Sequence, residues 1–493
     1  MASAFVSLIL LGLYLTMAPS QLTWSNFGSD AGDYLAAVLT QGIPHPSGYP
    51  TYIILGGLFQ KIPLGTPYFR GALLSIIPAA LACGLLSFLV NSMLPPLSTK
   101  RVFPGVLAGL WLGTTSLYWS QAVIVEVHAL NALFVVLSLF WVYALGAPHS
   151  SFSQPGYLIA LAALVGLGVG NHLILLLGAP VWLLALGWFA RRPEGLKPAV
   201  WQLAALFFGL LVYLILPLRA RHFPAINWGN PQNLEGFLWQ VAAQPYQGLA
   251  FHTPQAVVWE RLSSWVIALA AEVGYIGVAL GILGLFAAFS KSRPIGWFSL
   301  FFGGIYSIFA LGYYSNDSQV YLIPLYLLVA IWLAFGLDAI SRRISKAGGA
   351  GMILLVIALL IYKGIATYPQ VDPRRDLRAA RFVEEYLDRI PPNALVITDA
   401  DQDTFALWYY HFGLSARPDI ILVVSKLADF EWYRQTLTHI YPHLSYPPDS
   451  PQYEKSGVWL ADFLVFNPAK PVCRSTLDQE SEQIVNTHCS FSR

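Results

Sequence analysis

The sequence predicts a polytopic α-helical membrane protein with a small water-soluble α/β domain at its C-terminal end. The chain has 493 residues, of which 56% are hydrophobic and only 11% are charged, whereas soluble domains average about 25% charged residues. The charges are also unevenly placed. Residues 1–367 contain 16 Lys and Arg and 9 Asp and Glu, and residues 368–493 contain the other 12 and 17. We therefore expect a membrane module at 1–367 and a soluble domain at 368–493.

Composition excludes several other classes of protein. An aromatic content of 14% is too high for a disordered chain, and a formal charge of +2 gives no electrostatic footprint for nucleic acid. Three cysteines cannot build a disulfide-dense scaffold or an all-cysteine tetrahedral metal site. The sequence also lacks a Gly-rich phosphate loop and a His-Glu-x-x-His zinc motif.

Apolar stretches of about 17–25 residues are long enough to cross a bilayer, and the sequence contains eleven. They are 3–19, 70–92, 103–120, 129–146, 156–170, 172–189, 200–217, 263–289, 296–313, 320–340 and 350–367. The first is interpreted as an uncleaved span because it lacks a basic start and a small-residue cleavage site. The fifth and sixth adjoin and are also compatible with a re-entrant pair. Residues Tyr49–Phe59 are too short to span and are expected at the interface.

Positive residues at the span ends predict a cytoplasmic N-terminus. The cytoplasmic loops are then 93–102, 147–155, 190–199, 290–295 and 341–349. They hold ten Lys and Arg, including Lys100 and Arg101, against one acid, Glu194. An odd number of spans places residues 368–493 outside the cytoplasm. We expect a bacterial plasma membrane rather than the endoplasmic reticulum.

Polar groups capable of chemistry fall mostly on the predicted outer side. A transporter places such groups near the bilayer midplane on interrupted helices, but mid-span ionisable residues are scarce here, Glu272 being the main candidate. An active site on the outer face of a membrane scaffold is therefore favoured. A lipid or lipid-linked-sugar transporter, and a non-catalytic protein that binds lipid carriers, remain the alternatives.

The first outer loop contains two acids, Asp30 and Asp33, followed by His45 between two prolines. At a helix start, Asp30 can be an N-cap and Asp33 an N3 acid that satisfy free amides. The functional alternative is a general base at the membrane surface, oriented by a second acid or by a histidine. His45 is either a plain loop imidazole or a part of this group.

These residues resemble a known family. Asp30-Ala-Gly-Asp-Tyr and His45-Pro-Ser-Gly-Tyr-Pro are similar to the Asp-Ser-Gly-Glu-Phe and His-Pro-Pro-Gly-Tyr-Pro motifs of O-mannosyltransferase-like proteins, which are GT-C glycosyltransferases. The resemblance continues, in order, through five further segments, which are Tyr118–Asn131, Gly168–His172, Leu216–Ala220, Asn227–Pro231 and residues 386–419. This chain departs from the family motifs at Asp33 for Glu, Ser47 for Pro and His128 for Tyr.

The resemblance implies a GT-C fold and inverting transfer of a sugar, mannose, from a polyprenyl-phosphate carrier. The acceptor would be a hydroxyl group, on protein Ser or Thr or on a glycan, at the extracytoplasmic face. GT-C enzymes have an essential acid in the first outer loop, and Asp30 keeps the spacing to the aromatic Tyr34. Asp30 is therefore the predicted base, with Asp33 as its helper or as an acceptor-positioning acid.

Cations must stabilise the charge that develops on a departing lipid phosphate. The predicted phosphate-binding residues are Arg70, Arg219, Arg221 and His172, since the arginine fork binds two phosphate oxygens at once. For the arginines, simple contact with lipid head groups is the alternative. The predicted acceptor-binding or supporting residues are His45, Glu126, His128, Asn171, Asn227, Trp228, Asn316 and Asp317, several of which could instead cap helices. No metal site is predicted, and assistance by a divalent ion stays open.

The soluble domain is predicted to alternate helices and strands. Residues 380–390 have helical spacing, residues 394–398 and 419–424 are strand-like, and a helix is expected at 404–412. Asp399 to Asp403 are interpreted as a capped, solvated turn between strand and helix. A disulfide between Cys473 and Cys489 is a hypothesis consistent with an outer location.

Overall fold

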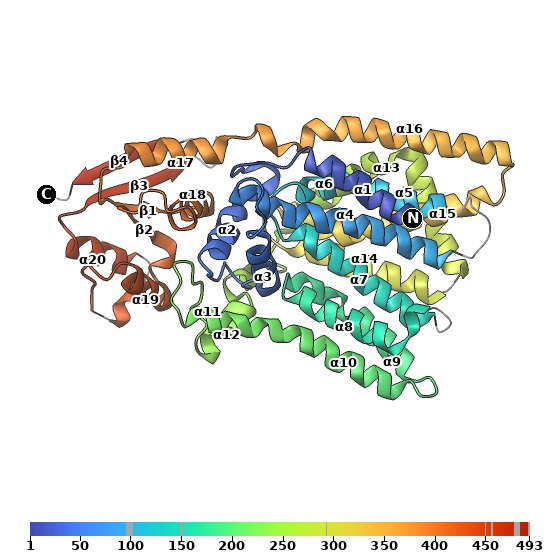
Figure 1. Cartoon of the computed structure of the whole chain (residues 1–493), viewed down its shortest axis with the longest axis horizontal. Coiled ribbons are helices and arrows are strands. Elements are labelled where there is room, and N and C mark those ends of the chain that lie inside the picture. The colour runs from blue at the N-terminus through green and yellow to red at the C-terminus, as the bar shows by residue number, and fades with distance from the viewer. Residues whose placement is uncertain are drawn as a thin grey trace.

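The computed structural model describes residues 1–94, 102–147, 151–291, 293–448, 450–454, 457–477 and 484–491. A long bundle of apolar helices occupies one end of the molecule and an α/β domain the other (Figure 1). Lys100 and Arg101, which carry part of the predicted charge asymmetry, lie outside the described residues.

The bundle is built from helices that coincide with the predicted apolar stretches. Its helices are α1 (Ala2–Leu15), α4 (Pro67–Met93), α5 (Val102–Gly113), α6 (Ser116–Ala122), α7 (His128–Gly146), α8 (Pro155–Val169), α9 (Ala179–Ala190), α10 (Leu196–Leu210), α11 (Ile215–Ala220), α13 (Gln255–Lys291), α14 (Arg293–Gly312), α15 (Ile323–Ser341) and α16 (Lys346–Val371). Short 3₁₀ turns at Leu173–Gly178 and Ser318–Leu322 run into α9 and α15.

Eight helical segments in the described part of the chain are long and apolar enough to cross a membrane. The predicted spans 3–19, 103–120 and 156–170 correspond to shorter apolar helices, so their crossing stays a prediction. Helices α4 and α15 lie in the middle of the bundle, whereas the apolar windows of α13 and α16 are exposed at its outside. The segment predicted at the interface forms the ten-residue helix α3 (Pro50–Phe59).

The one ionisable residue predicted in mid-span is paired. Glu272 of α13 forms an ion pair with Lys363 of α16. Its Oε1 also accepts bonds from the amide, at 2.8 Å, and the hydroxyl of Ser116. Trp111 of α5 lies under the Lys363 ammonium, 5.1 Å from ring centroid to nitrogen. This cluster ties the peripheral helices α13 and α16 to the bundle, and it offers no unpaired charge for a transport path.

Between the bundle and the α/β domain lie the first outer loop, α2 (Ala31–Leu39) and α3, seen near the centre of Figure 1. A second connection, containing α12 (Leu234–Val241), runs beneath them. Helix α16 spans the length of the bundle and continues past the predicted domain boundary at Tyr368 to Val371. The soluble domain therefore begins with α17 (Arg378–Arg389), after a short linker.

The C-terminal domain has the predicted α/β character. Its sheet has the order β2-β1-β3-β4, formed by β1 (Leu395–Thr398), β2 (Ile421–Val424), β3 (Pro471–Leu477) and β4 (Ile484–Phe491). Strand β1 runs parallel to β2 and β3, and β3 pairs antiparallel with β4. Helices α18 (Asp401–Trp408), α19 (Glu431–Ile440) and α20 (Val458–Phe466) complete the domain. The hypothesised disulfide is present, joining Cys473 to Cys489 across β3 and β4.

Candidate active site

The two acids of the first outer loop have different surroundings. Asp30 immediately precedes α2, but its side chain makes no capping bond to the helix. Asp33 lies in the first turn of α2 and is fully buried, whereas 35% of the Asp30 side chain is exposed. The helix-capping interpretation therefore does not account for these carboxylates, and only Asp30 is open to a substrate.

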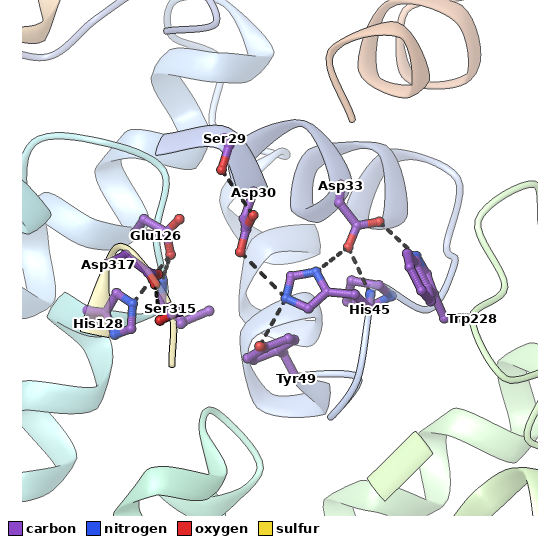
Figure 2. A network of polar contacts seen from close by, with 12 residues as sticks. Ser29, Asp30, Asp33, His45, Tyr49, Glu126, His128, Trp228, Ser315 and Asp317 are labelled. Carbon is purple, nitrogen blue, oxygen red and sulfur yellow. Dashed lines mark hydrogen bonds and ion pairs between the residues drawn. The ribbon is translucent and has the colours of Figure 1, made fainter. Parts of the chain in front are cut away.

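Asp33 fixes the position of His45 through contacts with its backbone amide and with Nδ1 of its ring (Figure 2). One oxygen, Oδ2, accepts the His45 amide at 2.8 Å and lies 2.7 Å from the ring atom Nδ1. The other oxygen accepts a bond from Trp228 Nε1 at 3.3 Å. These contacts fix the plane of the imidazole and leave its second nitrogen, Nε2, facing the opposite way.

The free side of the imidazole meets Asp30 and Tyr49. Nε2 lies 3.6 Å from Asp30 Oδ2 and 3.0 Å from the Tyr49 hydroxyl, as Figure 2 shows. The chain thus builds a line of Asp33, His45 and Asp30, in which a buried acid orients a histidine and the histidine touches an exposed acid. Such arrangements move or stabilise protons next to a reacting group.

The environment raises the pKa of both Asp30 and His45. Burial, partly offset by the neighbouring His45, raises the pKa of Asp30 to about 6. For His45, burial opposes the charged ring, but the hydrogen bond that the ring donates to Asp33 and the charges of Asp30 and Asp33 prevail and raise its pKa. A carboxylate with a pKa of about 6 suits proton abstraction near neutral pH.

A close contact between two loops places His45. The backbone of Ile43 donates to Ile226 at 2.8 Å and accepts from Trp228 at 3.2 Å. A Cβ atom at Gly42 would lie 2.3 Å from the Ile226 carbonyl oxygen, so this approach requires glycine. The loop that carries Asn227 and Trp228 therefore fixes the loop that carries His45.

Asp30 opens into a cavity of about 1100 Å³. Its wall combines aromatic rings with a few polar groups, an arrangement typical of small-molecule sites. The aromatic lining residues are Trp24, Phe27, Tyr49, Tyr246, Phe309, Tyr313, Tyr321 and Phe405. The charged and imidazole residues of the wall are Asp30, His45, His172, Asp317, Asp401 and Lys426.

The C-terminal domain forms one side of this cavity. Ala400, Asp401 and Gln402 follow β1, and Lys426 follows β2. Helix α18 packs directly on α2. A Cβ atom at Gly32 would lie only 2.2 Å from the Phe405 carbonyl oxygen, so this close contact requires glycine. The Phe405 ring also stacks on His45 with 6.0 Å between ring centroids.

The structure does not bring the three predicted phosphate-binding arginines to the cavity. Arg70 donates to Gln60 Oε1 at 3.1 Å and to the Gly65 carbonyl at 2.9 Å. Arg219 donates to the Gly42 carbonyl at 2.9 Å, and Arg221 is exposed. None of the three is among the residues that line the cavity.

The fourth predicted phosphate-binding residue, His172, does line the cavity. Its Nδ1 accepts the Ile174 amide at 3.2 Å, so in the neutral ring the proton is on Nε2. Burial lowers the pKa of His172 well below its ordinary value. His172 is therefore a neutral hydrogen-bond donor.

The remaining predicted residues divide into three groups, of which two lie in or beside the cavity. Asn316 and Asp317 line the cavity, and Ser315 donates to Asp317 at 2.6 Å. Glu126 and His128 lie next to it, 4.0 Å apart, and burial raises the pKa of Glu126 well above its ordinary value.

Two amides, Asn171 and Asn227, are buried and support the loops around the cavity. Asn171 donates to the Val127 carbonyl at 3.1 Å, and Asn227 donates to Asn230 at 3.1 Å.

Sequence reasoning missed Lys426 and underrated Asp401. Both directly follow strands that were predicted, but nothing local distinguishes them from ordinary surface residues. Asp401 lies in the turn that was interpreted as capped and solvated. Asp403 provides the cap, accepting the Ala400 amide at 3.0 Å, while Asp401 faces the cavity. Among the described residues, no three His, Cys, Asp or Glu side chains gather as metal ligands.

Comparison with known proteins supports the resemblance seen in the motifs. Residues 30–195 match the Protein O-mannosyl-transferase TMEM260 N-terminal domain, and residues 379–447 match TMEM260-associated domain 2. The chain is 26% identical over 451 residues to Protein O-mannosyl-transferase TMEM260 of Mus musculus, covering 86% of this chain. It is 22% identical over 524 residues to the Dictyostelium discoideum tmem260 protein, covering 94% of this chain. The chain spans 63% of the length of each of these relatives.

Solved structures show the same fold. ArnT from Cupriavidus metallidurans, bound to undecaprenyl phosphate, aligns with a TM-score of 0.57 at 14% identity, covering 96% of this chain and 92% of ArnT. Its apo state aligns with a TM-score of 0.58 at 11% identity, over the same shares of both chains. The predicted GT-C fold is confirmed: the chain has the fold of ArnT, and two of its segments are similar to domain models of the TMEM260 O-mannosyltransferase family.

Proposed function

We propose that this chain is a glycosyltransferase that moves mannose from a polyprenyl-phosphate carrier to a hydroxyl group of a protein. The names of the curated relatives support the sugar and the acceptor. Undecaprenyl phosphate bound to ArnT supports the lipid carrier. The charge distribution of the loops supports an extracytoplasmic reaction.

The observation that carries this proposal is Asp30, the exposed acid of the Asp33–His45–Asp30 line, at the wall of the cavity. In the proposed step, Asp30 removes the proton of the acceptor hydroxyl as its oxygen bonds to the sugar C1. The bond from C1 to the phosphate oxygen breaks, and the phosphate leaves with the electron pair. Direct attack from the opposite face inverts the configuration at C1.

His45 supports this step without replacing Asp30. Its Nε2 lies beside Asp30, so the imidazolium favours the ionised carboxylate that acts as base. Asp33, which is fully buried, reaches no substrate and acts through His45. The tyrosines and Phe405 around the cavity give the apolar faces against which a sugar ring stacks.

The departing phosphate needs donors, and Lys426 and His172 are placed to provide them. Lys426 is exposed in the cavity wall and is the single Lys or Arg among the described lining residues. The Nε2 proton of neutral His172 adds a hydrogen bond without adding charge. These two groups take the role first assigned to Arg70, Arg219 and Arg221.

The proposal is tested by Asp30→Asn, with Asp401→Asn as the matched control because both acids line the cavity. Transfer of labelled mannose from a polyprenyl-phosphate mannose to a Ser/Thr peptide is measured in detergent, together with binding of the carrier. We expect Asp30→Asn to lose about 10²–10⁴-fold in transfer while binding is retained, and Asp401→Asn to lose far less. Unchanged transfer by Asp30→Asn would eliminate Asp30 as the base.

A further inference from the structure

The loop that precedes Asp30 is tied to the linker between α16 and α17, residues 372–377. Asp376 Oδ2 accepts a bond from the Thr23 hydroxyl at 2.7 Å and from the Trp24 amide at 3.0 Å. Asn26 donates to the carbonyl of Val371, the last residue of α16, at 2.9 Å. Segments about 350 residues apart in the sequence are thus joined directly beside the candidate active site.

The tied loop belongs to the cavity wall. Trp24, Asn26 and Phe27 line the cavity, as do Ser29 and Asp30, which follow them. Thr23 is 1% exposed and Trp24 5% exposed, so water does not compete for their bonds to Asp376. Any shift of this loop moves the start of α2 and with it the carboxylate of Asp30.

The backbone of this loop also needs external support. Asn26 and Phe27 are consecutive non-glycine residues in the left-handed region, with φ of 59° and 65°. Such residues persist only where the surrounding structure holds them. Two contacts provide this hold at Asn26: its side chain bonds to Val371, and its carbonyl accepts Gln121 Nε2 at 2.9 Å. Asp376 holds Thr23 and Trp24, just before Asn26 and Phe27 in the chain.

Asp376 itself is kept ionised. Arg378 Nε donates to its Oδ1 at 2.7 Å. Burial opposes the charge, but the bonds from Arg378 and Thr23 outweigh it and keep the pKa of Asp376 below its ordinary value. The carboxylate is therefore a constant acceptor for Thr23 and Trp24 over the whole pH range in which Asp30 titrates.

We propose that Asp376 is a positioning residue for Asp30, acting through its bonds to Thr23 and Trp24. It does not line the cavity and so does not touch the substrate. The inference rests on the proposed function, because it concerns the placement of the proposed base. It also gives the linker a role: the junction of the two modules sets the geometry of the active site.

The linker contains its own matched control. Asp372 pairs with Arg374 at 2.8 Å, two residues ahead, as Asp376 pairs with Arg378. Asp372 bonds to no residue of the first outer loop in the described contacts. Asp372→Ala therefore removes an equivalent linker ion pair, whose arginine bonds to the Thr16 carbonyl at 2.6 Å, and leaves the bonds of Thr23 and Trp24 to Asp376 in place.

The experiment compares Asp376→Ala, Asp376→Asn, Thr23→Val and Asp372→Ala in the full-length protein. We expect Asp376→Ala and Thr23→Val to lower kcat at least tenfold, with less than a twofold change in KM for the lipid-linked mannose. Asp376→Asn keeps an oxygen that accepts both bonds, so it should recover most of the kcat. Asp372→Ala should remain within twofold of the wild type.

Thr23→Val changes no charge and almost no volume, so it reports on positioning even if Asp376→Ala folds poorly. The inference is overturned if Thr23→Val keeps wild-type kcat, or if the Asp376 and Asp372 alanine variants behave alike. It is also overturned if KM rises in proportion as kcat falls. These outcomes differ from failure of the proposed function, in which Asp30→Asn itself retains transfer.

Discussion

Replacing Asp33 by asparagine tests whether this buried acid affects catalysis through His45. In the native protein Asp33 bonds to both the amide and Nδ1 of His45. Asp33→Asn keeps the size of the side chain and removes its charge. His45 then loses a group that raises its pKa. The pKa of the imidazole therefore falls, and the ring loses its proton, and with it the positive charge beside Asp30, at a lower pH than in the native protein.

The size of the effect follows from the distance between the two groups. His45 Nε2 and Asp30 Oδ2 are 3.6 Å apart, where Coulomb's law gives about 1 kcal/mol in water and about 5 kcal/mol at an effective dielectric of 20. Asp30 is 35% exposed, so the lower end applies. A tenfold change in a protonation equilibrium corresponds to about 1.4 kcal/mol. The Asp33 charge itself also raises the pKa of Asp30, more weakly than His45 lowers it, so we expect the pKa of Asp30 to rise and the midpoint to move by less than about one pH unit.

The sign of the pH effect is determined by the role of Asp30 as a base. A base acts when deprotonated, so kcat/KM rises with pH through the pKa of Asp30, which is about 6. A higher pKa moves this rise toward alkaline pH. Below the native midpoint we expect the activity of Asp33→Asn to fall by up to about tenfold, because up to about tenfold less Asp30 is then deprotonated. The loss should shrink as the pH increases.

The assay is the pH profile of kcat/KM from pH 5 to 9 for Asp33→Asn, His45→Gln and the double variant. Because Asp33 acts through His45, the midpoint of the double variant should move no further than that of His45→Gln alone. Asp403→Asn is the control, since burial also raises the pKa of Asp403 to about 6 but it does not line the cavity. An unmoved midpoint in Asp33→Asn, additive effects in the double variant, or a moved midpoint in the control would refute this reasoning.

Two further predictions concern other parts of the molecule. Lys426→Met removes the ammonium proposed to stabilise the leaving phosphate. We expect kcat to fall at least tenfold while the affinity for the carrier, measured in parallel, changes less. Equal losses in kcat and in carrier affinity would assign Lys426 to ground-state binding instead. Glu272→Gln leaves the ammonium of Lys363 buried without its partner and should destabilise the protein by about 3 kcal/mol. Glu385→Gln, which breaks an exposed pair on α17, should change stability by less than about 0.5 kcal/mol; thermal unfolding in detergent that ranks the two variants equally would contradict this.

The sequence was informative where structure depends on local pattern. Apolar length predicted the helices of the bundle, and alternating helical and strand-like segments predicted the order of α17, β1, α18 and β2. The charge step located the change from membrane to soluble composition, but α16 continues through Tyr368 to Val371. A helix can continue across this change in composition. The composition decides whether the helix is surrounded by lipid or by water, but the backbone hydrogen bonds of the helix stay the same.

The site was less predictable because its contacts are not local. The motif placed Asp30, Asp33 and His45 in one loop region, yet the division of labour depends on burial: Asp33 is enclosed and Asp30 is open. Part of this enclosure comes from Trp228, which donates a hydrogen bond to Asp33 from a loop 195 residues away. No pattern within the first outer loop contains this information.

The arginines illustrate the opposite error. Arg70 and Arg219 lie near helix ends on the predicted outer side, as a phosphate ligand would, but both donate to carbonyl oxygens of neighbouring loops. Loop carbonyls need hydrogen-bond donors, and a long cationic side chain satisfies them as readily as it binds a ligand. Position in the sequence cannot distinguish these two uses.

The placement of Lys426 and Asp401 makes the C-terminal domain a part of the proposed catalytic unit. Strands β1 and β2 are parallel, so their carboxyl ends meet at one edge of the sheet, which is where α/β domains bind ligands. Here that edge faces the membrane module, and the residues after each strand line the cavity. The membrane module contributes the proposed base, Asp30, and the α/β domain contributes the proposed phosphate cation, Lys426. The close packing of Gly32 on Phe405 fixes the position of α18 relative to α2. The compositional boundary therefore separates apolar from polar sequence, whereas the proposed site takes residues from both sides of it.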